Sequence, residues 1–195
     1  MTLLLLILGA FLLGSVPFGA VIARIKGINL RKVGSGNIGT TNVLRSVGKF
    51  PALLTLILDV LKGTVPVLAA QYLSVGTLPT GIVGLSAVAG HNFSVFLRLR
   101  GGKGVATSIG VLLAYAPRVA LVTIALWVLV ALVTRYSSLG ALTAFSVLPL
   151  TMYFLDPERQ KILIAVVMAA LLILKHVANI QRLIHGTESK IGEKI

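Results

Sequence analysis

The sequence LLLLILGAFLLGSVPFGAVIA occupies residues 3–23 and contains no charged side chain. A helix needs about 20 apolar residues to cross the hydrocarbon core of a bilayer, and this run supplies them. Within it, Gly14-Ser15-Val16-Pro17 favours a kink or close packing against another helix. No basic residue precedes the run, so we expect a first membrane span rather than a cleaved signal peptide.

The composition of the whole chain agrees with this first run. Of the 195 residues, 56% are apolar and 12% are charged, and the mean hydropathy is +0.99. Soluble domains contain about 25% charged residues. The composition therefore predicts an all-α integral membrane protein that forms a single domain, residues 1–195.

The positive charge is concentrated in short loops beside the apolar runs. The formal net charge is +13, from 18 Lys and Arg against 5 Asp and Glu. Loop 24–49 contains no acidic residue and six basic ones: Arg24, Lys26, Arg31, Lys32, Arg45 and Lys49. Basic loops of membrane proteins face the cytoplasm, so we place this loop there, with the N-terminus outside. In this setting the charge indicates lipid and anionic substrates, and we expect no nucleic-acid partner.

Further apolar runs extend over about 51–72, 80–97, 105–116, 118–134, 137–155 and 161–179. They predict about seven transmembrane helices in all, with a cytoplasmic C-terminal tail, 180–195. The order of the spans places loop 98–104 on the same side as loop 24–49, the cytoplasmic side. Loop 98–104 is itself basic, which agrees with this placement. Because 105–116 and 118–134 are short, five full spans plus a re-entrant pair remain the alternative, with the same sidedness.

The most polar stretch, GSGNIGTTNVLR at residues 34–45, lies between the first two apolar runs. Gly34, Gly36 and Gly39 let the backbone approach a ligand and turn several N–H groups towards one anion. The side chains that can donate hydrogen bonds are Ser35, Asn37, Thr40, Thr41 and Asn42. Arg45 adds a planar fork that matches a phosphate. A Gly/Ser loop is often a solvated linker, but its place between apolar runs predicts a phosphate or acyl-phosphate site.

A second polar cluster extends from residue 90 to residue 107 and contains His91, Asn92, Gly102 and Lys103. Lys103 stands between glycines just before an apolar helix, where an ammonium beside a helix N-terminus suits a phosphate. Taken alone, a Gly-Gly-Lys-Gly turn is more typical of a basic topology loop.

A third cluster, 176–188, begins with His176 and Asn179, which share one helix face, and continues to Arg182 and Glu188. A His near a helix end is most often a surface or capping residue. All three clusters nevertheless fall on the predicted cytoplasmic side.

Two ionisable residues, Asp59 and Lys62, lie within the second apolar run and share one helix face. At that depth they must face protein or water, and a structural ion pair is as reasonable as a functional one. No G-x-S-x-G or H-E-x-x-H motif occurs, and no His begins an H-x-x-x-x-D motif. With no Cys either, the sequence predicts neither a metal site nor a cofactor.

Four segments together resemble the bacterial membrane acyl-phosphate:glycerol-3-phosphate acyltransferases, the PlsY family. They are GSGNIGTTNVLR (34–45), DVLKG (59–63), GHNFSVFLRLRGGKGVAT (90–107) and HVANIQRLIHGTES (176–189). The resemblance implies transfer of a fatty acyl group from acyl phosphate to the 1-hydroxyl of sn-glycerol 3-phosphate, which gives lysophosphatidic acid and phosphate for phospholipid biosynthesis. It also implies a seven-helix bundle in the bacterial cytoplasmic (inner) membrane, with the site facing the cytoplasm.

The resemblance assigns roles to residues of all three clusters. Catalysis is assigned to Ser35, Asn37, His176 and Asn179. Substrate binding is assigned to Gly34, Gly36, Gly39, Thr40, Thr41, Asn42, Arg45, Gly102 and Lys103. A second layer of residues is expected to support these loops without contacting substrate: Asp59, Lys62, His91, Asn92, Arg182 and Glu188. Because acyl phosphate carries a good leaving group, we expect substrate-assisted transfer with no covalent acyl-enzyme.

The expected partners are acyl phosphate, glycerol 3-phosphate and membrane lipid, and the expected state is a monomer. The competing hypothesis is an organophosphate transporter, which would also have basic loops and intramembrane charges. Transporters usually contain internal repeats and midplane binding residues, and neither is evident here. A lipid phosphatase, which would use water as the acceptor, is a third hypothesis.

Overall fold

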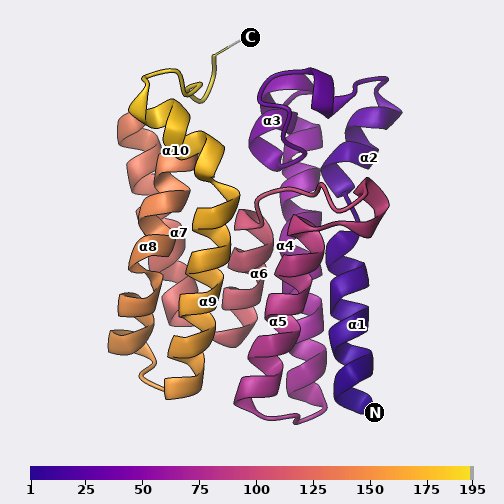
Figure 1. Ribbon diagram of the computed structural model, residues 1–195, viewed down its shortest axis with the longest axis vertical. Helices are drawn as coiled ribbons and strands as arrows, with labels where there is room; N and C mark the ends of the chain where they lie inside the picture. The colour runs from indigo at the N-terminus through magenta and orange to yellow at the C-terminus, as the bar shows by residue number, and fades with distance from the viewer. Residues whose placement is uncertain (194–195) are drawn as a thin grey trace.

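The computed structural model describes residues 1–193, and every regular element in this range is a helix (Figure 1). The elements are α1 (Thr2–Ser15), α2 (Phe18–Ile25), η1 (Leu30–Lys32), α3 (Thr40–Ser46), α4 (Lys49–Tyr72), α5 (Thr77–Asn92), η2 (Val95–Leu97), α6 (Val105–Tyr115), α7 (Pro117–Thr134), α8 (Ser137–Leu155), α9 (Arg159–Lys175) and α10 (Val177–Ile184). The prediction of an all-α fold is confirmed.

The lengths of these helices limit how many can cross a bilayer alone. Within residues 1–193, five segments are long and apolar enough: Thr2–Ile25, Lys49–Tyr72, Thr77–Leu97, Pro117–Thr134 and Ser137–Leu155. A sixth is added if α9 and α10, which are bent by 59° to each other, form one broken span. Helix α6 has 11 residues, which at 1.5 Å per residue is roughly 16 Å, about half of a bilayer core. The count of seven therefore stays a prediction.

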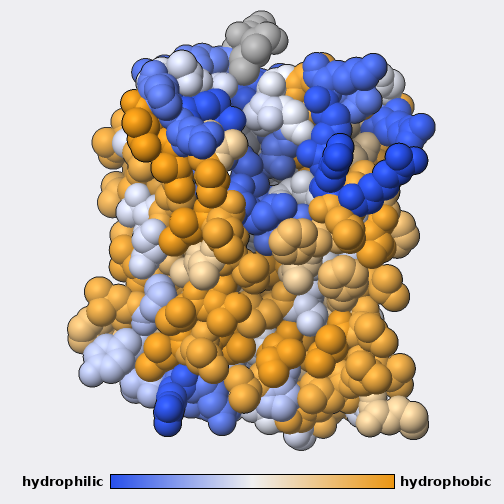
Figure 2. Space-filling view, viewed as in Figure 1, coloured by the Kyte–Doolittle hydropathy of each residue, from blue (hydrophilic) through white to orange (hydrophobic). Residues whose placement is uncertain are grey.

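The long helices run side by side along the longest axis of the molecule (Figure 1). Helices α2, α3 and α10 lie together at the end from which the C-terminal tail leaves, and the N-terminus lies at the opposite end. Hydrophilic side chains cover the end formed by α2, α3 and α10, whereas the face below is mostly hydrophobic apart from a small hydrophilic group at the opposite end (Figure 2). The three polar clusters of the sequence are therefore concentrated at one end of an apolar bundle.

Glycines allow two pairs of helices to cross at close range. A Cβ on Gly90 of α5 would collide with the carbonyl oxygen of Phe11 in α1, and one on Gly110 of α6 would collide with that of Val60 in α4. Such small-residue contacts are how helices approach closely in membranes. They fix α1 against α5 and α4 against α6, and so determine where the loops at the polar end emerge.

The main apolar core lies where α4, α6, α7, α8 and α9 meet. Its large buried side chains include Val111, Leu112, Phe145, Leu148, Met152, Met168 and Leu172. Short as it is, α6 contributes two of these. This packing holds α6 and α8 against α9 below the polar end.

The predicted kink in the first apolar run is confirmed, because α1 ends at Ser15 and α2 begins at Phe18. The buried ammonium of Lys62 donates to the carbonyl oxygen of Val16 at this break, at 3.0 Å. It also pairs with the Asp59 carboxylate at 2.8 Å. The pair thus has a structural role, since its ammonium gives a second hydrogen bond to a carbonyl at the break, which also accepts the N–H of Phe18 at 3.1 Å.

Candidate active site

A cavity of about 170 Å³ lies at the polar end, between α3, α4, α6, α8 and α10. Its lining includes fourteen of the residues predicted from the sequence: Ser35, Asn37, Gly39, Thr40, Thr41, Asn42, Arg45, Asp59, His91, Lys103, His176, Asn179, Arg182 and Glu188. The three polar clusters therefore meet around one space. Apolar side chains complete the wall, among them Leu56, Val105, Ile109, Trp127 and Ala141.

The loop before α3 is shaped by Asn42, whose side chain is 1% exposed. Its amide nitrogen donates to the carbonyl oxygens of Leu30, Val33 and Asn37 at 3.3, 3.2 and 2.8 Å. Its amide oxygen accepts the N–H of Ser35 at 3.0 Å. Asn42 was predicted to bind substrate directly, but its hydrogen-bonding groups are used to hold the loop that presents Ser35 and Asn37.

Three of the predicted substrate-binding glycines, Gly34, Gly36 and Gly102, do not line the cavity. Gly34 and Gly36 have φ of 55° and 69°, which lets the loop turn where residues with a Cβ are strained. A Cβ on Gly34 would collide with the side-chain oxygen of Asn42, and one on Gly102 would collide with the His91 ring. These glycines set the path of the two loops.

Three cations and two carboxylates line the cavity: Arg45, Lys103, Arg182, Glu188 and Asp59, the last of which pairs with Lys62. Burial, opposed in part by Glu188 and reinforced by Arg182 and Arg45, lowers the pKa of Lys103 to about 8. A buried excess of positive charge attracts an anion, which would in turn keep the ammonium protonated.

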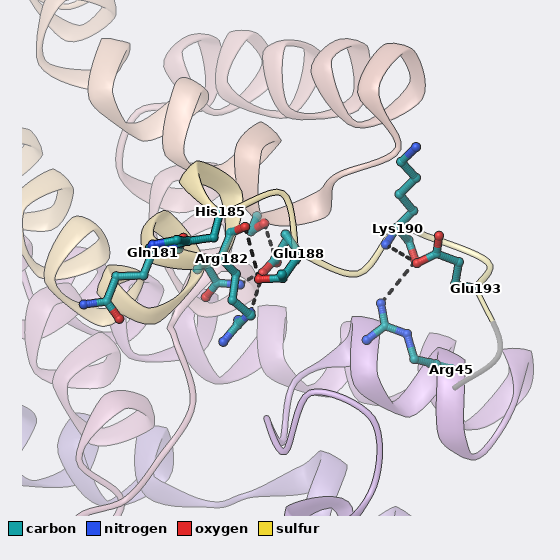
Figure 3. A network of polar contacts seen from close by, with 10 residues as sticks. Arg45, Gln181, Arg182, His185, Glu188, Lys190 and Glu193 are labelled. Carbon is teal, nitrogen blue, oxygen red and sulfur yellow. Dashed lines mark hydrogen bonds and ion pairs between the residues drawn. The ribbon is translucent and has the colours of Figure 1, made fainter.

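Glu188 connects three of the neighbouring side chains (Figure 3). One carboxylate oxygen accepts from the Ser138 hydroxyl and from the Asn179 amide, each at 2.6 Å, and the other accepts from Nε of Arg182 at 2.7 Å. Burial alone would raise the pKa of Glu188, but these hydrogen bonds hold it below its ordinary value. Glu188 thus stays ionised and fixes Asn179 and Arg182 in place.

The tail after α10 is held beside the cavity by two arginines, Arg45 and Arg135. The carbonyl oxygen of Lys190 accepts from Arg45 at 3.2 Å, as Figure 3 shows. Ile191 exchanges hydrogen bonds with Arg135, at 2.7 Å through its N–H and at 3.1 Å through its carbonyl oxygen. These contacts bring Glu188 and Ser189 into the lining.

His176 is 2% exposed and lies at the bend between α9 and α10. Its Nδ1 is 2.9 Å from the carbonyl oxygen of Leu172. A carbonyl can only accept, so Nδ1 carries the hydrogen and a neutral ring keeps Nε2 as an acceptor. Two further lining atoms, the Thr40 hydroxyl and the Asn179 amide oxygen, are buried without a hydrogen-bond partner among residues 1–193. These atoms are available to a polar ligand.

Loop 98–104, which presents Lys103, is held by the end of α5. The N–H of Gly102 donates to the carbonyl oxygen of His91 at 2.9 Å, and that of Gly101 donates to Asn92 at 3.2 Å. Lys175 of α9 donates to the same Asn92 oxygen at 3.0 Å. The backbone carbonyl groups of His91 and Asn92 thus hold the loop. Of the residues expected behind the site, Lys62 and Asn92 do not line the cavity.

Sequence reasoning missed the start of α8, where Ser137 and Ser138 line the cavity. The Ser137 hydroxyl lies 3.2 Å from that of Thr41, and the Ser137 carbonyl oxygen accepts from the Trp127 indole at 3.2 Å. Ser138 is one of the three donors to Glu188. The available signal was a pair of hydroxyls just after Arg135, on the predicted cytoplasmic side.

Known proteins match this chain over nearly its whole length. The family model described as glycerol-3-phosphate acyltransferase matches residues 4–186. The glycerol-3-phosphate acyltransferase of Trichlorobacter lovleyi is 49% identical over 94% of this chain and 95% of its own length. That of Sinorhizobium fredii is 50% identical over 99% of this chain and 94% of its own length.

Two solved structures have the same fold. They are crystal structures of PlsY (YgiH), an integral membrane glycerol 3-phosphate acyltransferase, in a glycerol 3-phosphate form and a lysophosphatidic acid form. The TM-scores are 0.94 and 0.91, at 42% and 40% identity, and each alignment covers 98% of this chain and 96% of the solved chain. The present chain therefore belongs to the family of integral membrane glycerol-3-phosphate acyltransferases.

Proposed function

We propose that the cavity transfers a fatty acyl group from acyl phosphate to the 1-hydroxyl of sn-glycerol 3-phosphate, giving lysophosphatidic acid and phosphate. The observation that carries the proposal is that one cavity is lined both by three cations, Arg45, Lys103 and Arg182, and by apolar side chains. Both substrates carry phosphate, and the donor also carries an acyl tail. Solved relatives in glycerol 3-phosphate and lysophosphatidic acid forms support the acceptor and the product.

The three cations bind the two phosphate groups. Arg182 uses Nε for Glu188 and Arg45 uses one terminal nitrogen for Lys190, so each guanidinium keeps further donors. Lys103 adds a point charge between them. Ser35, Asn37 and the free hydroxyl of Thr40 bind the acyl-phosphate head group, and the backbone around Gly39 lets it approach.

The reaction then needs no nucleophile from the protein. The 1-hydroxyl oxygen bonds to the acyl carbon, the bond from that carbon to the phosphate oxygen breaks, and phosphate leaves. The hydroxyl proton passes to the phosphate of glycerol 3-phosphate, whose second pKa is about 6. The protein contributes position and charge, which are large terms in catalysis.

His176 and Asn179 orient the acceptor. With its hydrogen on Nδ1, a neutral His176 accepts a hydrogen bond through Nε2, so it suits a glycerol hydroxyl rather than the acyl carbonyl. The free amide oxygen of Asn179 is likewise an acceptor, and Glu188 fixes its direction.

In the membrane, residues 1–195 form one domain that acts as a monomer. Seven helical segments, including the short α6, span or enter the bacterial cytoplasmic membrane. The N-terminus lies outside, whereas loops 24–49 and 98–104 and the tail 180–195 face the cytoplasm. The distribution of basic residues supports this sidedness.

Phosphate release tests the function. Purified protein in detergent should release phosphate from palmitoyl phosphate only when glycerol 3-phosphate is added, with an equal amount of lysophosphatidic acid detected by mass spectrometry. Release with water as the sole acceptor would indicate a phosphatase. Uptake of glycerol 3-phosphate into liposomes without chemistry would indicate an organophosphate transporter.

A further inference from the structure

We propose that Arg31 is a positioning residue for this reaction: its guanidinium joins loop 34–39 to loop 98–104 and so sets the place of Lys103 opposite Ser35. The inference rests on the function proposed above. In the sequence, Arg31 is one of several basic residues of loop 24–49, where charge alone would account for it.

The contacts of Arg31 reach two loops far apart in the chain. Nη1 donates to the carbonyl oxygen of Gly36 at 3.1 Å. Nη2 donates to the carbonyl oxygen of Gly101 at 3.2 Å, and it also contacts that of Arg100. One guanidinium therefore bridges the loop that presents Ser35 and the loop that presents Lys103.

The partners of the Arg31 guanidinium are all backbone carbonyl groups. None of the ion pairs found in residues 1–193 includes it. A planar fork binds several acceptors in fixed directions, whereas an ammonium acts as a point charge. The contacts thus fix the backbone of two loops rather than neutralise a carboxylate.

The backbone at Arg31 is held in place by its neighbours. Its own N–H donates to the side-chain oxygen of Asn29 at 3.0 Å, at the start of η1. The adjacent Leu30 is 2% exposed, and its carbonyl oxygen accepts from Asn42. Although the Arg31 side chain is exposed, it therefore extends from a buried anchor.

The position of Lys103 depends on this bridge. Gly101 precedes Lys103 by two residues and is held from one side by the Asn92 carbonyl and from the other by Arg31. Among the hydrogen bonds of the described residues, those of Arg31 alone connect loop 98–104 with loop 34–39. Without them, no hydrogen bond among the described residues sets the distance between the two loops.

The neighbouring Lys32 is a matched control. It is also exposed and carries the same charge, and its side chain makes no hydrogen bond or ion pair with the described residues. Removal of Lys32 changes the charge of the loop without removing the bridge.

The test is steady-state kinetics of Arg31→Ala, Arg31→Lys and Lys32→Ala, with unfolding temperatures in detergent as the measure of folding. Both Arg31 variants should raise KM for glycerol 3-phosphate about tenfold, with a smaller effect on kcat, since lost charge-assisted hydrogen bonds misplace the site. Lys32→Ala should match the wild type. If Arg31→Ala does not fold, Arg31→Lys carries the test, because it keeps the charge but lacks the fork.

A double-mutant cycle separates positioning from general destabilisation. In the Lys103→Met background, Arg31→Lys should change KM less than twofold, because the group that it positions is gone. Equal effects in both backgrounds, or wild-type kinetics of both Arg31 variants in an active protein, would overturn the inference alone. A wild-type protein without acyl transfer would instead overturn the proposed function.

Discussion

The Nδ1 atom of His176 lies 2.9 Å from the carbonyl oxygen of Leu172, one turn earlier in α9. Because Nδ1 donates its hydrogen to this carbonyl, Nε2 carries no hydrogen in the neutral ring and is a hydrogen-bond acceptor. The same geometry would suit a general base, so the two roles must be separated by experiment.

Under substrate assistance, His176→Asn should retain detectable turnover, because the acceptor's own phosphate takes the proton. General acid–base catalysis contributes about 10²–10⁴-fold, so removal of a true general base would lower turnover by about that factor. The measurement is the pH profile of kcat for both proteins, which should bend near the substrate phosphate pKa in each. Complete loss of turnover with glycerol 3-phosphate binding intact would make His176 the base.

The alkaline side of the pH profile should report Lys103. Its pKa is lowered to about 8, so the ammonium is charged below that pH and loses its charge above it. Because the charged form binds phosphate, kcat/KM should fall above pH 8 by about tenfold per unit. Lys103→Arg stays charged and should move this fall to higher pH. An unchanged profile in Lys103→Arg would assign the titration to another group.

Glu188→Gln should lower kcat/KM at least about tenfold, because an amide cannot accept all three hydrogen bonds from Ser138, Asn179 and Arg182. Since Glu188 raises the pKa of Lys103, its loss should also move the alkaline fall to lower pH. The matched control is Glu193→Gln in the same tail, which removes one negative charge and keeps an acceptor for the Lys190 N–H. Equal kinetics of the two variants would remove Glu188 from the site.

The proposed sidedness rests on the positions of the basic residues and is directly measurable. The chain has no Cys, so single substitutions give clean probes. Thr187→Cys, exposed at the polar end, should react with a membrane-impermeant maleimide only from the cytoplasm, and Gln160→Cys in the first turn of α9 only from outside. The reverse pattern in intact cells would invert the proposed topology.

Much of the fold was predictable because a bilayer imposes simple rules on length and charge. The broken first run around Pro17 and the three polar clusters at one end followed directly from the sequence. The extent of α6 was predicted as well, since the apolar run 105–116 corresponds to Val105–Tyr115, but whether its 11 residues cross the bilayer was not. Hydropathy does not distinguish a short buried helix from a full crossing.

The site was predictable as a set of residues but not as a set of roles. Asn42 and Gly102 belong to motifs that suggest ligand contact, yet one shapes a loop and the other makes room for His91. Arg31 was counted only as loop charge. Such roles depend on contacts between residues far apart in the chain, which spacing alone does not reveal.

The central claim is direct transfer between two phosphate-bearing substrates, and rapid mixing tests it most directly. Purified protein mixed with palmitoyl phosphate alone should release no phosphate within a single turnover. Later addition of glycerol 3-phosphate should start release together with an equal amount of lysophosphatidic acid. A burst of one phosphate per protein before the acceptor is added would reveal a covalent acyl-enzyme and contradict the account.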